Sequence, residues 1–476
     1  MVITRKIADY VVSTQLEDFP PDAVHAAKGA IMDCLGCALA GSQESLANIL
    51  SEFVLANGGG QSASVIGRGF KASPADAAQI NGAMSHALDY DDITRALKGH
   101  PTAVLMPPAL ALAESEGATG REMLMAYMLG FEVACSIGDA MSPAYYDELG
   151  WHPTGPVGAL GAAVAASRLL KLDREQTAMA ISLAASQAAG LRQNFGTMTK
   201  PFHAGAACRT GVTSAQLVAA GFTASLDAIE GRFGFMHAFS GGEEYHTDQI
   251  LENLGKTCYL VESGIEIKKY PCCGSAHLAL DATTRILERS PLNASDIEKI
   301  DVEVDFDPPR SLIHDRPLSA LEGKFSMQYC LAAAMLDGQV GMSAFTDEQV
   351  LRAEAQALIP KVNMHRAAGY QGQPSWVEAY NEVSVHLKDG TVLTERVDRI
   401  DEGALRGVTM EEIIEKFRDC TSTALPADET QELITGLSEL EQLPDVRRMA
   451  DLLRGQAVAL PARFPDRRCV PTGEEW

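Results

Sequence analysis

Aromatic side chains are scarce in this chain: Phe, Trp and Tyr together make up 6% of its 476 residues. Sheets rely heavily on aromatic and β-branched residues, so this scarcity, together with abundant alanine, favours close-packed helices over a β-sandwich. Because 46% of the residues are hydrophobic, collagen-like and disordered classes are excluded. A chain of this length is expected to form two domains, or one large domain with an insertion.

Positive charge is also scarce, since 39 lysine and arginine residues face 63 acidic ones, a formal net charge of −24. This balance argues against nucleic acid or an anionic membrane surface as the main partner. The N-terminus lacks the apolar run of a signal peptide, and the longest apolar stretch, residues 103–113, is short and contains two prolines. The ten cysteines are scattered, which is typical of reduced thiols. We therefore expect a cytoplasmic protein without a membrane span.

Familiar cofactor and nucleophile motifs are missing as well. The sequence has no dinucleotide fingerprint after a strand, no phosphate-binding P-loop and no serine-hydrolase elbow. Cys34 and Cys37 form a lone CxxC among small helical residues, which favours packing over metal binding. The neighbouring Cys272 and Cys273 lie in no motif that specifies a thiol nucleophile. We expect neither a cofactor nor a metal.

Two kinds of periodicity divide the chain. Up to about residue 260, apolar residues recur at helical spacing between glycine and proline breaks. Residues 260–270 and 296–304 alternate like half-buried strands, and residues 382–397 are typical of a hairpin that turns at Asp389-Gly390. Helices are predicted again over 275–288, 325–336, 409–416 and 429–453. The sequence thus predicts a helical domain over 1–264 and 399–476, with an α+β unit over 265–398 inserted into it.

Five segments concentrate side chains that can move protons or hold anions. The run 85–92 places His86 and three carboxylates near a helix end, a pattern shared by metal sites and solvated helix termini. His100 and His152 each precede Pro-Thr, which predicts an imidazole at a helix N-terminus. The helix dipole there keeps an imidazole neutral and able to accept a proton. The alternative for His100 and His152 is a structural role in a loop.

The remaining two segments carry lysines. Lys200 stands directly before a proline among small residues, as expected of a carboxylate anchor, although an ordinary surface charge is the alternative. Lys268 and Lys269 interrupt an apolar pattern, which indicates that at least one points into an anion-binding cleft. Histidine, lysine, aspartate and tyrosine without a cofactor motif suit proton removal beside a carboxylate, with stabilisation of the resulting enediolate.

These segments resemble the MmgE/PrpD family, which includes 2-methylcitrate dehydratase, cis-aconitate decarboxylase and iminodisuccinate epimerase. The resemblance covers essentially the whole chain and rests on residues 33–41, 86–92, 100–102, 152–155, 199–205, 230–231, 270–273 and 325–329. It implies a mainly α fold, with a large all-helical domain built from both chain ends and a smaller α+β lid domain. It also implies a homodimer that needs no cofactor.

The resemblance implies site residues by position. The implied catalytic residues are Asp89, His100, His152, Lys200 and Tyr329. The implied substrate-binding residues are Lys268, Lys269, His203, Cys273 and His277.

Three places depart from the family's pattern. Cys273 stands where the cis-aconitate decarboxylases have histidine. Ala103 and Val104 stand where the methylcitrate dehydratases have polar residues, which we expect to meet substrate. Ile93 separates the acidic run from Thr94, which shifts the local spacing by one residue.

The leading interpretation is a cofactor-independent lyase or isomerase that acts on a small di- or tricarboxylate by α-proton abstraction, most closely a 2-methylcitrate dehydratase-like hydro-lyase. Lys200, with Lys268 or Lys269, would hold carboxylates, and His100 or His152 would take the proton. Asp89 would orient or partner an imidazole, and Tyr329 would donate to a leaving hydroxyl or reprotonate carbon. An epimerase of an iminodisuccinate-like dicarboxylate and then a cis-aconitate decarboxylase are the alternatives. A non-catalytic carboxylate-binding protein and a metal-dependent hydrolase that uses residues 86–92 are rivals from other classes.

Overall fold

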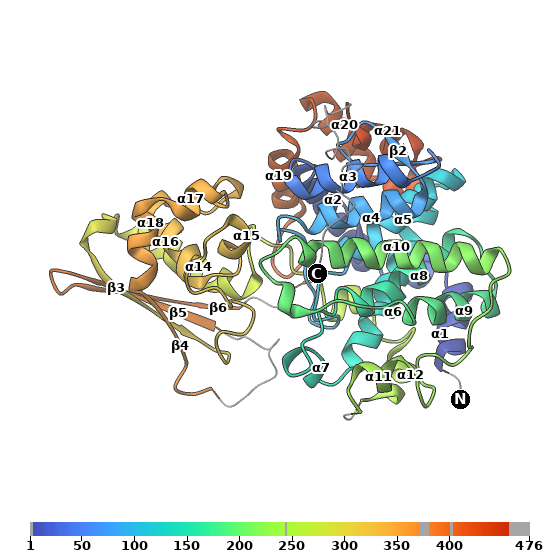
Figure 1. Ribbon diagram of the computed structural model, residues 1–476, viewed down its shortest axis with the longest axis horizontal. Helices are drawn as coiled ribbons and strands as arrows, with labels where there is room; N and C mark the ends of the chain where they lie inside the picture. The colour runs from blue at the N-terminus through green and yellow to red at the C-terminus, as the bar shows by residue number, and fades with distance from the viewer. Residues whose placement is uncertain (1–2, 243–244, 371–379, 400–402, 457–476) are drawn as a thin grey trace, which may run out of the picture.

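A large helical domain lies beside a smaller α+β lid domain in the computed structural model of the chain (Figure 1). The structure describes residues 3–242, 245–370, 380–399 and 403–456. The mainly α fold with a smaller α+β part, predicted from the sequence, is confirmed.

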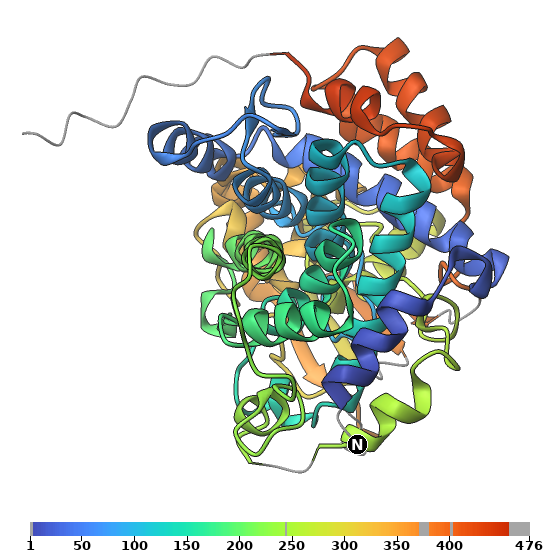
Figure 2. The same cartoon turned by 90° about the vertical axis from the view of Figure 1, so that its right-hand side faces the viewer.

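Both ends of the chain build the helical domain, in which the C-terminal helices pack beside α2 (Figures 1 and 2). Its N-terminal part contains α1 (Ile3–Ser13), α2 (Pro21–Gly41), α3 (Ser45–Asn57), β1 (Ala63–Ser64), β2 (Lys71–Ala72), α4 (Pro74–His86), α5 (Thr102–Glu116), α6 (Gly120–Ala140), α7 (Ala144–Asp147), α8 (Pro156–Leu169), α9 (Arg174–Ala185), α10 (Thr199–Ala219), α11 (Phe235–Phe239), α12 (Thr247–Asn253) and α13 (Tyr259–Glu262). Its C-terminal part contains α19 (Met410–Thr421), α20 (Ala427–Ser438) and α21 (Arg447–Arg454).

Glycines allow α4 and α10 to cross closely. A Cβ on Gly205 of α10 would lie 2.3 Å from the backbone oxygen of Gln79 in α4, and a Cβ on Gly82 would lie 3.2 Å from Gly205 Cα. Only glycine permits so short a distance between helix axes. This crossing brings the first turn of α10, with Lys200, beside the last turn of α4, with His86.

The lid contains a four-stranded sheet in the order β4-β3-β5-β6. Strands β3 (Ile297–Val304) and β4 (Val362–Arg366) are parallel, whereas β5 (Tyr380–Leu387) and β6 (Val392–Asp398) form an antiparallel hairpin beside β3. The helices α14 (His277–Arg289), α15 (Ala320–Gly323), α16 (Met327–Asp337), α17 (Asp347–Leu351) and α18 (Ala353–Leu358) lie over one face of the sheet (Figure 1). Alternate residues such as Ile300, Val302 and Val304 are buried, as the period of two predicts.

Two cores are separated along the chain. One core includes residues from Ile3 to Ile265 and from Leu405 to Leu453, whereas the other includes residues from Tyr270 to Val397, with Phe195 added from the helical domain. The lid is therefore an insertion between two parts of the helical domain. The chain leaves the helical domain near residues 265–270, and Leu405 again belongs to its core.

Two of the predicted elements are wrong. Residues 260–270 form no strand, since residues 260–262 belong to α13 and the rest pairs only through an isolated bridge from Glu266 to Ile93. Its alternation places Lys268 inward against Asp89 rather than on a sheet. The single helix predicted over 429–453 is broken between α20 and α21, where Pro444 cannot continue a helix. The predicted helices near 275–288, 325–336 and 409–416 and the hairpin are confirmed.

Two helices, α2 and α6, are long and apolar enough to cross a membrane by length and composition alone. Inside the protein, 83% and 94% of their most apolar windows are buried, and α6 contacts α5 and α8. Core helices of globular domains have the same composition.

Candidate active site

The turn that follows α4 presents Asp89 in an uncommon backbone conformation. The φ angle of Asp89 is 52°, in the left-handed region that residues other than glycine rarely adopt. Among the described residues other than glycine, Lys98, Lys171, Arg310 and Arg406 share this conformation, and all of these except Lys171 line the same cavity as Asp89. Such strained residues gather where the surrounding structure over-determines the backbone, which is a property of functional sites.

Asp89 lies between two buried lysines from different segments. Its Oδ1 is 2.6 Å from Lys200 Nζ at the start of α10, and its Oδ2 is 3.1 Å from Lys268 Nζ in the interdomain segment. Burial by itself raises the pKa of Asp89, but the two ammonium groups outweigh burial and hold that pKa well below its usual range. Asp89 is therefore ionised, and the group of Asp89, Lys200 and Lys268 carries a net positive charge.

Asp91 joins two histidines. Its Oδ1 lies 2.9 Å from His86 Nδ1, and its Oδ2 lies 3.1 Å from His100 Nδ1. His86 Nδ1 is hydrogen-bonded to this carboxylate, whereas His100 Nδ1 lies at ion-pair distance from it without hydrogen-bond geometry. A proton on each Nδ1 leaves a lone pair on each Nε2. The Nε2 of His86 then accepts from Lys200 Nζ, 2.8 Å away, while His100 lines the cavity.

Burial keeps these imidazoles neutral. It lowers the pKa of His100 to about 3, although the neighbouring Asp91 raises that pKa. Burial and the charge of Lys200 likewise hold the pKa of His152 well below its usual value. Lys200 has a lowered pKa because burial disfavours its charge, whereas Lys268 has a raised pKa because Asp89 and Asp91 outweigh its burial. Neutral imidazoles beside ammonium groups are suited to accept a proton near a bound anion.

The two His-Pro-Thr motifs meet at this cluster. His100 precedes α5 by two residues and His152 precedes α8 by four, so each lies before a helix start, as predicted. The two ring centroids are 6.4 Å apart, and the ring of His152 stacks 5.8 Å from that of His86. His203 of α10 lies behind His152, with 3.1 Å between their Nδ1 atoms, and is absent from the residues that line the cavity.

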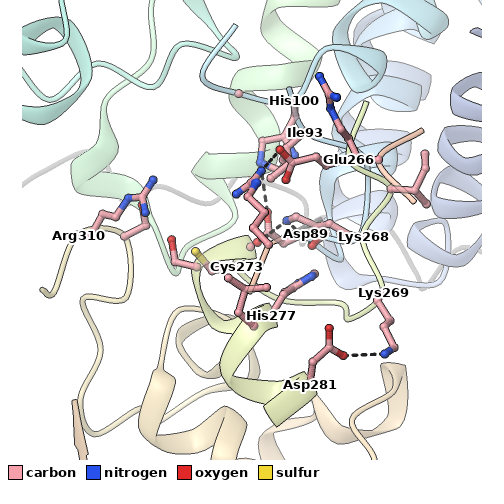
Figure 3. Close-up of a pocket in the computed structure, with 18 of the residues that line it drawn as sticks. Asp89, Ile93, His100, Glu266, Lys268, Lys269, Cys273, His277, Asp281 and Arg310 are labelled. Atoms are coloured by element: carbon pink, nitrogen blue, oxygen red, sulfur yellow. Dashed lines mark hydrogen bonds and ion pairs between the residues drawn. The ribbon is translucent and has the colours of Figure 1, made fainter. Parts of the chain in front are cut away.

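A cavity of about 360 Å³ opens over the cluster, with walls from both domains. Asp89, His100, His152, Lys200 and Lys268 lie on its helical-domain side. Figure 3 shows Cys273 and His277 on the lid side and Arg310 across the cavity from Lys268. Lys269 lies near the rim, where it pairs with Asp281 at 2.6 Å.

Tyr329 is not brought to the cavity. It is fully buried in the lid core on α16, and its hydroxyl donates to the backbone oxygen of Ala344. Its ring contacts Phe345. The position implied by the resemblance therefore places this hydroxyl away from the other candidate residues.

The departures from the family's pattern fall into two groups. Ala103 and Val104 are fully buried and absent from the cavity lining, and Val104 packs against Gly158 of α8, so the expectation that they meet substrate is wrong. Helix α5 turns these two side chains toward the core. Ile93 and Cys273 do line the cavity, and burial raises the pKa of the Cys273 thiol.

Some residues of the site were not selected from the sequence. His86 and Asp91 were noticed only as part of an acidic run, yet they link Lys200 to His100. Phe195 and Phe325 place their rings 5.2 Å and 5.1 Å from Lys200 Nζ, one from each domain. Because these two residues are 130 positions apart in the sequence, no local pattern could predict that their rings meet at Lys200.

The cluster also offers grouped metal ligands. Side chains of His86, Asp89, Asp91 and His100 place ligand atoms within 4.8 Å of one another. Lys200 Nζ lies between His86 and Asp89 and already supplies a positive charge there. Asp92, the further residue of the proposed metal hydrolase site, instead accepts a hydrogen bond from Thr102 at 2.7 Å.

Comparison with known proteins agrees with this architecture. The cis-aconitate decarboxylase of Mus musculus is 27% identical over 470 residues, which cover 96% of this chain and 94% of the relative. That of Homo sapiens is 28% identical over 466 residues, with 95% of each chain covered. The mitochondrial 2-methylcitrate dehydratase of Yarrowia lipolytica is 26% identical over 420 residues, 83% of this chain and 78% of the relative.

Two domain families account for most of the sequence. Residues 5–248 match the MmgE/PrpD N-terminal domain, and residues 270–442 match the MmgE/PrpD C-terminal domain. The first match ends at residue 248 and the second begins at residue 270, close to where the chain enters the lid. The chain therefore belongs to the MmgE/PrpD family.

Proposed function

We propose that the protein is a cofactor-independent lyase that dehydrates a small 2-methylcitrate-like polycarboxylate. The observation that carries this proposal is the pair of contacts Asp91–His100 and Asp89–Lys200 at the base of one cavity. The Asp91–His100 contact orients a neutral imidazole that can act as a base. The Asp89–Lys200 contact places an ammonium group where substrate carboxylates and a developing enediolate would need positive charge.

His100 is the better candidate base of the two histidines. Asp91 Oδ2 lies 3.1 Å from Nδ1, nearer than Asp89 Oδ1 lies to Nε2 at 3.6 Å, which favours the tautomer with the proton on Nδ1 and a lone pair at Nε2. The Nδ1 of His152 faces another imidazole, that of His203, which gives no comparable charge stabilisation after proton uptake. In the proposed reaction His100 takes the proton beside a carboxylate, the C–O bond of the neighbouring carbon breaks with its electron pair on oxygen, and the protonated His100 returns the proton to the leaving hydroxide. The net products are an alkene and water.

Anchors for further carboxylates line the same cavity. Lys268 lies on the helical-domain side and Arg310 on the lid side (Figure 3). A substrate with two or three carboxylates can thus span both domains. This arrangement also reconciles a net charge of −24 with an anionic ligand, because the cations are local to the cavity.

Decarboxylation of cis-aconitate is the second candidate. It is favoured by cis-aconitate decarboxylases that match 95% or more of the chain, among them those of Mus musculus and Homo sapiens. That reaction has to deliver a proton to carbon after carbon dioxide leaves, so it needs a protonated acid where burial now keeps His100 neutral. Epimerisation needs only the first proton transfer, followed by reprotonation on the opposite face.

Proton NMR in heavy water distinguishes these reactions. We would incubate the protein with methylcitrate, citrate, cis-aconitate, tartrate or iminodisuccinate and follow alkene signals, deuterium at the α-carbon and loss of carboxyl carbon. An alkene formed from methylcitrate or citrate supports the dehydratase. Conversion of cis-aconitate with release of carbon dioxide supports the decarboxylase instead, and deuterium uptake without alkene supports an epimerase.

Variants test the assignment of the base. His100→Ala is expected to abolish exchange and turnover, whereas His25→Ala, at an exposed site on α2, serves as the matched control and should behave like wild type. Thermal stabilisation by polycarboxylates without any reaction in the wild type would favour the non-catalytic binding protein. The homodimer and the cytoplasmic location remain predictions from the sequence, and sedimentation velocity tests the former.

A further inference from the structure

Three successive backbone carbonyls at the Asp89 turn each accept a hydrogen bond from a buried lysine. Lys324 Nζ donates to Leu88 O at 3.0 Å, Lys268 Nζ to Asp89 O at 2.7 Å and Lys416 Nζ to Tyr90 O at 2.8 Å. Helix α4 has ended by this point, so these carbonyls have no helical partners and need donors from elsewhere. The residues 88–90 with these three lysines are called the lysine clamp below.

Each lysine of the clamp comes from a different part of the chain. Lys324 follows α15 in the lid, Lys268 lies in the interdomain segment, and Lys416 lies on the C-terminal helix α19. Lys416 also donates to Lys268 O at 2.9 Å, which ties the interdomain segment to the same turn. The clamp therefore closes only when the lid and the C-terminal helices are docked together on the turn.

Two of the ammonium groups are balanced by carboxylates and one is not. Lys416 pairs with Asp33 at 2.7 Å, and Lys268 pairs with the side chain of Asp89 at 3.1 Å. Within the part of the chain that the structure describes, Lys324 Nζ has no carboxylate within 4.0 Å, although its residue is only 3% exposed. Its second backbone contact is Pro271 O at 3.5 Å, and it lies over the ring of Phe345. A buried charge bound only to carbonyls costs stability, so the fold alone gains little from it.

The location of Lys324 connects it to catalysis. The carbonyl that it holds belongs to Leu88, one residue before the left-handed Asp89 whose carboxylate bridges Lys200 and Lys268. A fixed Leu88 carbonyl limits the rotation of the peptide that leads into Asp89. The side chain of Asp89 can then keep both lysines in place, and a small displacement there moves the ammonium of Lys200 relative to a bound substrate.

We propose that Lys324 is a positioning residue that makes assembly of the Asp89–Lys200 cluster depend on docking of the lid. When the lid separates from the helical domain, Lys324 leaves Leu88 O and the turn loses one of its three donors. When the lid docks over a substrate, the clamp closes and fixes Asp89. The kinetic part of this inference rests on the proposed lyase function, whereas its structural part does not.

Lys324→Met removes the donor with little change in side-chain volume. Turnover should fall about 10²-fold, while KM changes by less than about threefold, because Lys200, Lys268 and His100 remain. The melting temperature should stay close to that of wild type, because loss of a desolvated charge offsets loss of the donor to Leu88 O. Lys324→Arg keeps a donor and a charge, and it should recover a large part of the turnover.

Lys361→Met is the matched control. Lys361 also belongs to the lid, and its Nζ donates to a backbone carbonyl, Ile297 O, at 2.6 Å, but this contact lies at the sheet and away from the cavity. This variant should keep wild-type turnover. Wild-type turnover in Lys324→Met, or equal losses in the two variants, would overturn the proposal.

Hydrogen exchange tests the clamp without any substrate. Amide exchange in a peptide that covers residues 86–92 should be faster in Lys324→Met than in wild type or Lys361→Met, because the turn has lost a restraint. Equal exchange in all three proteins overturns the proposal even if no substrate is found. Absence of turnover in the wild type, together with faster exchange in Lys324→Met, would instead contradict the proposed lyase function and leave the clamp supported.

Discussion

The ammonium nitrogen of Lys200 lies 2.6 Å from Asp89 Oδ1, although 111 positions of sequence separate the two residues. Both side chains are only 4% exposed. A buried pair of this kind contributes little to stability, but loss of one partner leaves the other charge uncompensated. Asp89 has a second cation in Lys268, so removal of Lys200 tests chemistry more than folding.

Replacement of Lys200 by methionine should lower kcat/KM by at least about 10². The variant loses the positive charge beside the proposed enediolate and the donor to His86 Nε2. Lys171→Met, at a side chain that is 80% exposed, is a suitable control. Steady-state kinetics with the substrate identified by NMR would measure the effect, and a loss smaller than about tenfold would remove Lys200 from the mechanism.

Replacement of the adjacent carboxylates Asp91 and Asp92 by asparagine is expected to affect turnover differently. Asp91→Asn should lower turnover about 10²-fold or more, because an amide at His100 Nδ1 no longer favours the tautomer with a free Nε2. Asp92→Asn should stay within about threefold of wild type. Burial raises the pKa of Asp92 well above its usual value, which favours the uncharged form that asparagine resembles. Equal losses in both variants would contradict the assigned role of Asp91.

The stability of the protein should fall as the pH drops from 6.5 towards about 3. Burial lowers the pKa of His100 to about 3 and that of His203 to about 4, whereas both residues titrate near 6.5 in the unfolded chain. Below pH 6.5 these histidines bind protons in the unfolded state but stay unprotonated in the folded state, so the free energy of unfolding decreases as the pH falls. Urea unfolding at stepped pH measures this slope. His203→Gln should flatten it between pH 6.5 and 4, and an unchanged slope in that variant would be inconsistent with a neutral buried His203.

Tyr329→Phe should keep wild-type turnover. The hydroxyl donates to Ala344 O inside the lid core, so its loss removes a structural hydrogen bond of about 1 kcal/mol rather than a proton donor. The variant should therefore have a lower melting temperature than wild type but the same kcat. A large drop in kcat at normal stability would show that this hydroxyl reaches substrate in another lid position.

Exhaustive chelation should leave activity unchanged. Lys200 Nζ occupies the position between His86 and Asp89 and provides the charge that a metal would supply in a hydrolase. Activity before and after treatment with EDTA, with metal content followed by elemental analysis, gives the result. Loss of activity on chelation with recovery on addition of zinc or magnesium would restore the metal-dependent alternative.

Much of the secondary structure could be predicted because its signals are local. The helix that begins after Ser73 has a side-chain cap at Asp76 N and a proline at its first position, and α4 begins there. The hairpin follows from strand alternation and from Gly390, whose φ of 90° suits the turn. The segment 260–270 shows the limit of such patterns. Its alternation is real, but it separates a side facing the Asp89 cluster from a side facing solvent, and no neighbouring strand is available to pair with it.

The candidate site was predicted as a set of separate segments, and most of them meet. His100, His152, Lys200 and Lys268 line one cavity with Asp89, as the motifs and the family resemblance implied. Tyr329 and Lys324 illustrate what a linear motif cannot specify. They lie five positions apart, yet the hydroxyl of Tyr329 turns into the lid core and the ammonium of Lys324 reaches the helical domain.

The sequence by itself determined the helical character of the chain, the insertion of a smaller domain near residue 265 and the residue types available for proton transfer, because these depend on local periodicity and composition. Only the tertiary structure decided which groups act on one another. Asp91 between two histidines and the three lysines on residues 88–90 bring together the end of α4, the turn before α5, the interdomain segment, the lid and α19. Charges alter one another's pKa values over a few ångströms, so a buried cluster acquires its chemistry only when the fold closes those distances.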